Sequence, residues 1–244
     1  MLNQFSRVEL ALGEGAFDRI KNSRICIAGV GGVGSFAAEA IARTGCVNLT
    51  LVDFDTICIS NLNRQIQTTV GNVGELKVYE MKKRIEQINP AAKVDSITTK
   101  ITGDNISQIF SGGFDYVVDA VDDVNAKILI IEYCYKNGIR LISAMGAASK
   151  MNPGQIRVAD ISQTHTDPLA RVIRKKLRSI GIEKGVEVVF SEETPLERHA
   201  ENCDGCEETK QQSGKVINGS LVFVTAVVGL AAAGVVIRSL VGEK

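Results

Sequence analysis

The feature that most constrains the fold is a run of glycines that follows a strand-like apolar segment. Residues 24–34 read Arg-Ile-Cys-Ile-Ala-Gly-Val-Gly-Gly-Val-Gly, so a buried strand is expected to enter a tight turn and then a helix. Gly29, Gly31 and Gly34 have the G-x-G-x-x-G spacing, and Gly32 is an additional glycine. Such a turn presents backbone N–H groups and a helix N-terminus to a phosphate. The motif predicts a nucleotide-binding domain but does not identify the nucleotide.

The order of the remaining elements predicts the fold class. Strand-like segments alternate with helical patterns, which favours a parallel sheet with right-handed crossovers and ligands at the carboxyl ends of its strands. We therefore expect a single α/β domain with a Rossmann-like, doubly wound, mainly parallel sheet in a core of residues 1–145. A C-terminal extension, residues 146–244, is expected to add strands at 155–160 and 186–190, a basic helix at 167–180 and an apolar helix at 221–237.

The segment after the second strand, 48–52, is rich in polar groups. Asp53 stands at the strand end, where a carboxylate can accept hydrogen bonds from both ribose hydroxyls. Lys77 falls in the first turn of the next helix, where a cation opposes the helix dipole unless an anion is near. The alternative for Lys77 is a solvated surface lysine. Within thirteen residues the candidate site residues of the segment are two carboxylates, two of its amides and an arginine: Asp53, Asp55, Asn61, Gln65 and Arg64.

Two further carboxylates, Asp119 and Asp122, lie at the end of the fourth strand, 116–120. Asp122 suits a Mg²⁺ ion that bridges phosphates, and its alternative role is to cap the helix that starts near Val124. Cations and a metal around phosphates fit nucleotidyl transfer better than hydride transfer, because they neutralise the charge that develops as pyrophosphate leaves.

The basic helix has a cationic face. Its residues Arg171, Arg174, Lys175 and Arg178 are spaced i, i+3, i+4 and i+7, which places them on one side of a helix. Lys+Arg and Asp+Glu both number 28, so the net charge does not indicate a polyanionic partner. The local face is a candidate for nucleic-acid phosphates, and a solvated surface is the alternative.

The apolar segment 221–237 approaches the length of a membrane span. Thr225, Gly229 and Ala233 place a small residue at every fourth position, which lets another backbone approach closely. A core helix on the main sheet or at a dimer interface is favoured over a membrane span. The first ten residues do not resemble a secretion signal, so we expect a cytoplasmic protein.

The six cysteines divide into two groups. Cys203 and Cys206 form one C-x-x-C, which supplies only half of a tetrahedral zinc site. Three interpretations stay open for this pair: a redox pair, a half-site completed by His199 or by another subunit, or a loop without chemistry. The others lie in apolar settings and are expected to be reduced, buried thiols: Cys26, Cys46, Cys58 and Cys134.

Over residues 7–145 these motifs resemble the ThiF/MoeB-like adenylating enzymes. The resemblance implies that ATP binds at Gly29–Gly34 with Asp55 and Asp119 nearby, and that a carboxylate is activated as an acyl adenylate. It also implies a homodimer in which Arg7 of one subunit reaches the ATP of the other. The implied contacts are Asp53 with the ribose, Asp122 with Mg²⁺, and Asn61, Arg64, Gln65 and Lys77 with the phosphates.

The C-terminal part resembles the tRNA threonylcarbamoyladenosine dehydratase subfamily, on residues 156–161, 167–171, 188–192 and 219–224. This resemblance implies that the substrate is tRNA carrying threonylcarbamoyladenosine, and it suggests an association with a cysteine desulfurase and sulfur-acceptor system. One alternative is an activator of a small sulfur-carrier protein ending in Gly-Gly, although a second C-x-x-C is absent. Another is a non-catalytic nucleotide-binding or redox adaptor.

Overall fold

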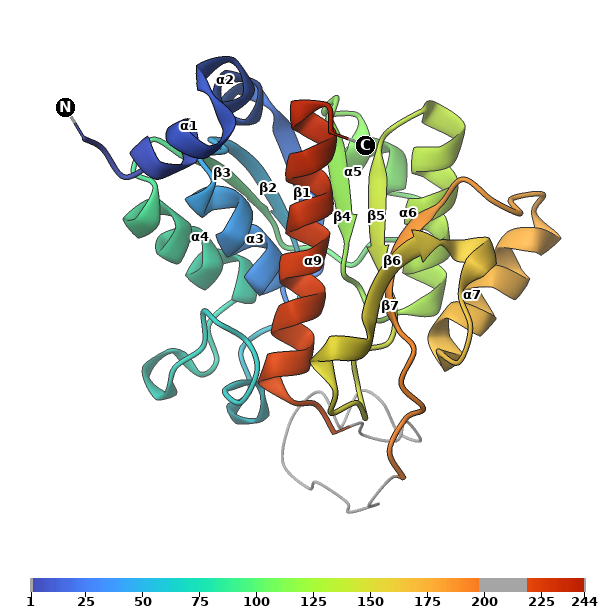
Figure 1. Ribbon diagram of the computed structural model, residues 1–244. Helices are drawn as coiled ribbons and strands as arrows, with labels where there is room; N and C mark the ends of the chain where they lie inside the picture. The colour runs from blue at the N-terminus through green and yellow to red at the C-terminus, as the bar shows by residue number, and fades with distance from the viewer. Residues whose placement is uncertain (1, 198–218, 244) are drawn as a thin grey trace.

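A single sheet organises the protein. The computed structural model describes residues 2–197 and 219–243, and within them seven strands pair in the order β3-β2-β1-β4-β5-β7-β6 (Figure 1). All neighbours are parallel except β6 and β7. The predicted sheet, including the strands of the extension, is confirmed. The strands are β1 (Arg24–Ala28), β2 (Asn48–Val52), β3 (Lys93–Ile97), β4 (Tyr116–Asp119), β5 (Leu141–Ala144), β6 (Ile156–Asp160) and β7 (Glu187–Ser191).

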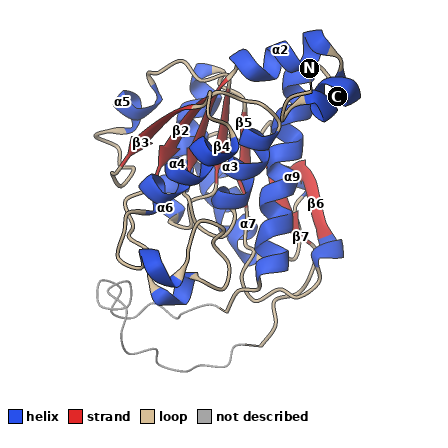
Figure 2. Ribbon diagram, turned by 90° about the vertical axis from the view of Figure 1, so that its left-hand side faces the viewer, coloured by secondary structure: helices blue, strands red, loops and turns tan. Residues whose placement is uncertain are grey.

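Helices cover both faces of the sheet (Figure 2). One core cluster joins the sheet to α2, α3, α4 and α9, a second joins it to α5 and α6, and a third joins α6 to α7. This is the doubly wound arrangement that the alternation of elements predicts. The helices are α1 (Ser6–Leu12), α2 (Glu14–Asn22), α3 (Gly34–Arg43), α4 (Lys77–Ile88), α5 (Ile106–Phe110), α6 (Val124–Asn137), α7 (Pro168–Ser179) and α9 (Val222–Val241).

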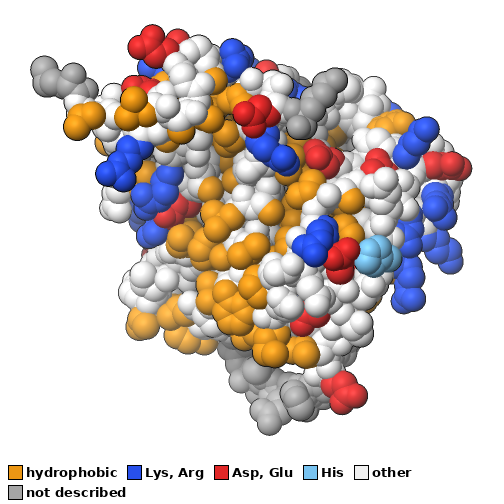
Figure 3. Space-filling model, viewed as in Figure 1, with side chains coloured by type: hydrophobic (Ala, Val, Ile, Leu, Met, Phe, Trp, Pro, Cys, Tyr) orange, Lys and Arg blue, Asp and Glu red, His pale blue; other side chains and the backbone are white. Residues whose placement is uncertain are grey.

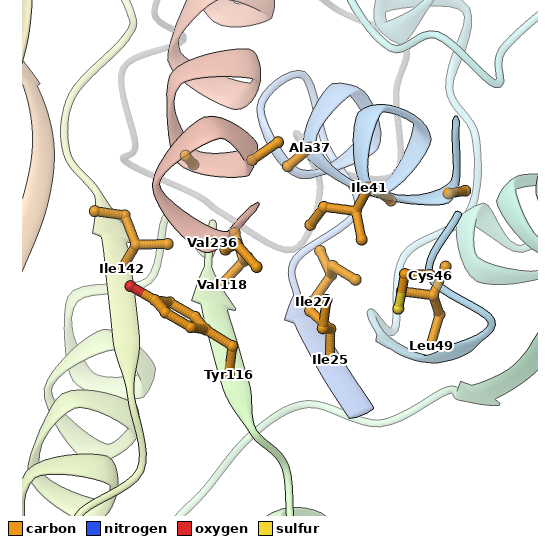
Figure 4. Close-up of a cluster of buried hydrophobic side chains, with 14 of the residues drawn as sticks. Ile25, Ile27, Ala37, Ile41, Cys46, Leu49, Tyr116, Val118, Ile142 and Val236 are labelled. Atoms are coloured by element: carbon orange, nitrogen blue, oxygen red, sulfur yellow. The ribbon is translucent and has the colours of Figure 1, made fainter. Parts of the chain in front are cut away.

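The central strands are mainly apolar and buried, with the exception of Arg24 at the start of β1, because both of their faces are covered. Figure 4 shows Ile25 and Ile27 of β1 beside Ala37 and Ile41 of α3 and Val236 of α9. All five side chains are fully buried. Helix α9 therefore belongs to the same core as the glycine turn and the helix that follows it.

The small residues of α9 are predicted to let another backbone approach closely, and Gly229 and Thr225 make this approach with the α3 region. A Cβ atom on Gly229 would lie 2.3 Å from the carbonyl oxygen of Val33 and 3.0 Å from Cβ of Phe36. Thr225 reaches the glycine turn itself, because a Cβ on Gly32 would lie 3.3 Å from the Thr225 side chain. The predicted close approach of a second backbone is confirmed, and that backbone is α3.

The C-terminal end of α9 is held by two arginines. Arg19 donates to the carbonyl oxygens of Leu240 and Val241, at 3.3 and 2.9 Å, and Arg140 donates to that of Ser239 at 3.3 Å. These bonds satisfy carbonyls that have no partner inside the helix. The 20-residue helix is long and apolar enough to cross a membrane, yet half of it is buried in the protein. Of the two favoured positions for this helix, the main sheet and a dimer interface, packing on the main sheet is confirmed.

Three of the four cysteines predicted to be buried thiols are free and buried: Cys26, Cys46 and Cys134. Burial raises the pKa of Cys46 and of Cys134 to about 12, and it also raises the pKa of Cys26. The prediction is wrong for Cys58, which is half-exposed and disulfide-bonded. Cys58 lies in a surface loop rather than inside a strand or helix, so its apolar neighbours in the sequence are a poor guide to its burial.

Candidate functional site

The glycine turn between β1 and α3 has a backbone that side chains would disrupt. Gly29 has a φ of 87°, and a Cβ atom there would lie 2.7 Å from the backbone of Ala120. A Cβ on Gly34 would lie 1.8 Å from the carbonyl oxygen of Gly29. The turn is therefore wedged between the ends of β1 and β4, and it needs glycine at both positions. Close packing at these two positions fixes the tight turn, whose backbone N–H groups and following helix N-terminus are the kind that bind a phosphate.

Asp53, which follows β2, hydrogen-bonds to the backbone of the glycine turn. Its Oδ2 accepts a hydrogen bond from the Val30 N–H at 2.6 Å, and its Oδ1 accepts one from the Asp55 N–H at 2.9 Å. Burial raises the pKa of the Asp53 carboxyl, and the nearby Lys77 ammonium partly offsets this rise. The predicted ribose-binding carboxylate thus lies beside the glycine turn and is fixed in place by two backbone bonds.

Lys77 begins α4 and points back toward the same edge of the sheet. Its Nζ lies 2.7 Å from Oδ2 of Asp55, and only 3 % of the residue is exposed. Asp55 supplies the anion that a cation at a helix N-terminus requires. The solvated-lysine alternative is wrong, because Lys77 is buried whereas the side chain of Lys82 on the same helix is 39 % exposed.

Two amide side chains of the segment after β2 are buried and incompletely hydrogen-bonded. Asn61 is fully buried; its Oδ1 accepts from the Cys58 N–H at 3.0 Å, while its Nδ2 has no partner. Oε1 of Gln65 is likewise buried without a partner. An unsatisfied buried donor or acceptor is costly unless a ligand completes it. The donor of Asn61 suits a phosphate or ribose oxygen, and the acceptor of Gln65 suits an amino or hydroxyl group, so both residues fit ATP.

Two carboxylates at the end of β4 have different surroundings. Asp119 is fully buried, and its Oδ2 accepts from Nζ of Lys127 at 2.9 Å and from the hydroxyl of Ser143 at 2.6 Å. Asp119 therefore faces the interior and anchors the turn after β4, and its implied place near ATP stays a prediction. Asp122 is exposed on that turn. The cap of α6 is Asp123, whose Oδ1 accepts from the Ala126 N–H at 2.8 Å, so the capping alternative for Asp122 is wrong.

Arg64 lies on the exposed side of the same segment. Its Nη1 donates to the Ser60 carbonyl at 2.8 Å and to Oδ1 of Asn63 at 2.9 Å, and its Cγ would lie 3.2 Å from a Cβ on Gly32. The chain thus brings Asp53, Arg64 and Lys77 to the glycine turn. A phosphate cradle, a ribose carboxylate and a buried lysine on one sheet edge can bind a nucleoside triphosphate.

Comparisons with known proteins agree with this geometry. The model of the ThiF family matches residues 4–244. The chain belongs to the ThiF family. It is 46% identical over 245 residues to the tRNA threonylcarbamoyladenosine dehydratase of Bacillus subtilis (strain 168), covering 100% of this chain and 96% of that protein. It is 44% identical over 188 residues to the Escherichia coli (strain K12) protein of that name, covering 74% and 70% of the two chains.

A solved structure is also similar. The crystal structure of E. coli tRNA N6-threonylcarbamoyladenosine dehydratase, TcdA, in complex with ATP superposes with a TM-score of 0.87 at 36% sequence identity, covering 98% of this chain and 94% of that chain. The fold expected from the sequence is thus that of a ThiF-family protein.

Two predicted groups of this ThiF-family chain lie away from the glycine turn. Arg7 is exposed on α1, which lies with α2 at the opposite end of the sheet in Figures 1 and 2. The cationic face of α7 is only partly exposed. Arg174 is half-buried and donates to the carbonyl oxygen and the hydroxyl of Thr164, both at 2.5 Å, so its assignment to an exposed cationic face is wrong. The cations that α7 exposes are Arg171, Lys175 and Arg178, with Lys176 beside them.

Sequence reasoning missed two residues that support the site. Gln67 is buried and its Nε2 donates to the Val30 carbonyl at 2.9 Å, which braces the glycine turn from below. Lys127 pairs with Asp119 and is fully buried. A signal existed for Lys127, because it shares a helical face with Ile130, Ile131 and Cys134, and a lysine on an apolar face needs a buried partner. Cys203, Cys206 and His199 lie outside the described residues.

Proposed function

We propose that the chain catalyses the ATP-dependent dehydration of threonylcarbamoyladenosine in tRNA. The observation that carries this proposal is that the Gly29–Gly34 cradle and the buried Lys77 lie at the same edge of the sheet. The full-length similarity to the B. subtilis dehydratase supports it. Hydride transfer to or from a nicotinamide does not require a buried lysine near the phosphates. Nucleotidyl transfer does, because charge develops on the phosphates as pyrophosphate leaves.

The proposed activation step joins the substrate to the nucleotide. A carboxylate oxygen of the threonyl group attacks the α-phosphorus of ATP, the bond from that phosphorus to the bridging oxygen breaks, and pyrophosphate leaves. Lys77 and Arg64 neutralise charge on the phosphates, while the N–H groups of the glycine turn hold the triphosphate in line for attack. Asp122 is the carboxylate that would hold Mg²⁺. One carboxylate suffices, because Mg²⁺ takes its other ligands from phosphates and water.

The proposed second step closes a ring. A nitrogen of the same modification attacks the activated carbonyl carbon, AMP leaves with the former carboxylate oxygen, and the nitrogen loses a proton. The tRNA loses the elements of one water, while ATP becomes AMP and pyrophosphate. Because the nucleophile belongs to the substrate, this chemistry requires no thioester on the protein.

Mass spectrometry of digested tRNA tests the proposal directly. Incubation with ATP, Mg²⁺ and threonylcarbamoylated tRNA should yield AMP and a modified nucleoside lighter by one water. An unchanged nucleoside mass would contradict the proposed function. Pyrophosphate exchange that requires a small protein ending in Gly-Gly, and not tRNA, would instead support the sulfur-carrier alternative.

The variant Lys77→Met should lower the rate of AMP formation by roughly 10²–10³-fold, the range found when one charge-stabilising donor is removed from a transition state. Lys82→Met is the matched control, because it removes a lysine from the exposed side of the same helix, and it should keep the wild-type rate. Steady-state kinetics with thermal unfolding of both variants measures the effect. Equal rates for Lys77→Met and wild type would exclude a role for Lys77 at the phosphates.

We place tRNA on the exposed cations of α7. Figure 3 shows Lys and Arg side chains gathered at the right-hand edge of the molecule, over α7. Residues Arg171, Lys175 and Arg178 are exposed there, and phosphate contacts of this kind dominate nucleic-acid affinity. A cytoplasmic location is proposed with this substrate. The expected association with a sulfur-acceptor system stays a prediction.

We further propose that the protein acts as a homodimer in which Arg7 completes the partner's site. In Figure 3 an apolar patch follows α9, and Val222, Phe223 and Leu230 are among its exposed side chains. A patch of this kind marks an interface, and burying it in a dimer explains it without membrane contact. Arg7 lies too far along the sheet to serve the site of its own chain.

Mixing Arg7→Ala with Lys77→Met subunits tests the exchange. Each variant alone should lose roughly 10²–10³-fold in rate, the loss expected when one charge-stabilising donor is removed. Mixed dimers contain one complete site, so random exchange should restore up to about a quarter of wild-type activity, because two-fold symmetry gives each dimer two sites. If mixing restores nothing while size-exclusion chromatography shows dimers, Arg7 does not act in the neighbouring subunit.

A further inference from the structure

A buried ion pair lies apart from the phosphate cradle, at the ends of β5 and β7. Nζ of Lys150 stands 3.9 Å from Oδ2 of Asp167, and both side chains are at most 1 % exposed. Burial lowers the pKa of Lys150 and raises the pKa of Asp167, so the protein interior disfavours both charges. A buried pair at this distance is weak evidence for stabilisation, and its position requires another explanation.

Strained backbone precedes each member of the pair. Among the described residues, Ser149 and Thr166 are the non-glycine residues with positive φ, at 54° and 62°. Threonine is β-branched and disfavours this region strongly. Strain of this kind persists only where surrounding contacts enforce it, and it concentrates at functional sites. At Ser149 the contacts are backbone bonds with Gly219 and Leu196, at 2.8 and 2.7 Å.

Each charge is held by groups from different loops. Nζ of Lys150 donates to the Ser191 carbonyl, at the last residue of β7, at 3.5 Å and to the Glu193 carbonyl just after that strand at 2.6 Å. Asp167 caps α7 through the Ala170 N–H at 2.9 Å, while its Oδ2 is buried without a hydrogen bond. Gly146 packs so closely that a Cβ there would lie 3.2 Å from both carboxylate oxygens. The pair thus ties residues 145–152 to the start of α7 and the end of β7.

The Lys150–Asp167 pair lies between two parts of the proposed site. Asp119 of β4 is in register with Ser143 of β5, so the segment 145–152 leaves the sheet at the edge from which Asp122 projects. Asp167 begins the helix whose first turn exposes Arg171, a proposed tRNA contact. The pair therefore joins the side of the site that a substrate carboxylate must approach to the helix that would hold the RNA.

We propose that Lys150 and Asp167 are positioning residues that fix the modified nucleoside of a helix-bound RNA relative to the phosphate cradle. This inference rests on the proposed function. Without the pair, RNA still binds the cations of α7, and ATP still binds the glycine turn. The carboxylate and the α-phosphate are then no longer held in one geometry, so turnover falls while both affinities persist.

The variants Asp167→Asn and Lys150→Met test the inference, together with their double variant. Asparagine caps helices as well as aspartate does, so Asp167→Asn keeps the cap and removes the charge. For Asp167→Asn and for the double variant we expect kcat with threonylcarbamoylated tRNA to fall at least about ten-fold, with the Kd values for ATP and tRNA within about three-fold of wild type, as expected for lost orientation rather than lost contacts. Lys136→Met, which removes a lysine of α6 whose side chain is 65 % exposed and which lies outside the proposed RNA-binding helix, is the matched control and should behave as wild type.

Thermal unfolding separates positioning from a merely structural role. A single substitution leaves one buried charge uncompensated, whereas the double variant removes both and should recover much of any lost stability. Recovery of stability without recovery of kcat supports the inference. Recovery of both, or a parallel loss of kcat and ATP affinity in Asp167→Asn, would overturn it. Failure of the proposed function is distinct, because the wild-type protein would then leave the nucleoside mass unchanged.

Discussion

Replacing Gly34 by alanine should severely weaken ATP binding. The new methyl group would lie 1.8 Å from the carbonyl oxygen of Gly29, 3.0 Å from its carbonyl carbon and 3.2 Å from Cβ of Ala120. None of these atoms can rotate away, because two are backbone atoms and the third is the Cβ of Ala120, whose position is fixed by its own backbone. The turn must open, and the Gly29 N–H bond to the Val52 carbonyl, now 2.8 Å, is expected to break with it.

We expect the Kd for ATP to rise at least about 100-fold, which corresponds to about 2.7 kcal/mol, with a lowered unfolding temperature from overpacking. Titration calorimetry with ATP and thermal unfolding measure the two effects. Gly103→Ala is the control, because a Cβ atom there meets nothing within 4 Å. Wild-type ATP affinity in Gly34→Ala would mean that the turn does not cradle the triphosphate.

The sequence predicts this turn because the requirement is local. A left-handed φ at Gly29 and the contact of Gly34 with Gly29 arise within six residues, and glycine alone tolerates them. The small residues of the apolar helix also predict a close backbone contact. They do not identify the neighbour, since α3 and α9 are almost 200 residues apart in the chain and meet only in the folded core.

Pairings between distant side chains are what the sequence does not reveal. Asp122 and Asp123 are adjacent and of the same residue type, so the sequence does not show which of them caps α6. Their backbone angles decide it. The helical spacing of Arg174 groups it with the cations of α7, yet its guanidinium donates hydrogen bonds to Thr164. Lys150 and Asp167 carry no periodic signal, because loops have no regular face. For Arg174, Lys150 and Asp167, tertiary packing decides the role of a charge that the sequence only places nearby, whereas the Asp123 cap is a local contact three residues along the chain.

Lys127→Met should strongly destabilise the fold. Lys127 and Asp119 are 0 % exposed, with Nζ and Oδ2 2.9 Å apart. Methionine fills a similar volume but leaves the Asp119 carboxylate buried with only the Ser143 hydroxyl and the Val121 N–H as donors. Breaking one partner of a buried pair costs about 3–5 kcal/mol, a large part of the roughly 5–15 kcal/mol that holds a typical domain together. Urea or thermal unfolding measures the loss.

Lys136→Met is the control on the same helix. Lys136 pairs with Glu132, but its side chain is 65 % exposed, and an exposed pair contributes at most about 1 kcal/mol. A second variant separates the buried charge from the buried shape. Adding Asp119→Asn to Lys127→Met removes the uncompensated carboxylate and should restore part of the lost stability, because deleting both members of a buried pair costs less than deleting one.

The double variant also separates stability from function. Asp119 accepts the Val121 N–H at 3.2 Å, so it orients the turn that carries Asp122, and asparagine keeps an acceptor there. If the folded double variant retains ATP turnover, the pair serves the fold alone. If stability returns while the Mg²⁺ concentration needed for half-maximal activity rises, the buried pair sets the position of Asp122. A loss below about 1 kcal/mol in Lys127→Met, the level of an exposed pair, would contradict the assignment of a buried, charge-paired interior at the end of β4.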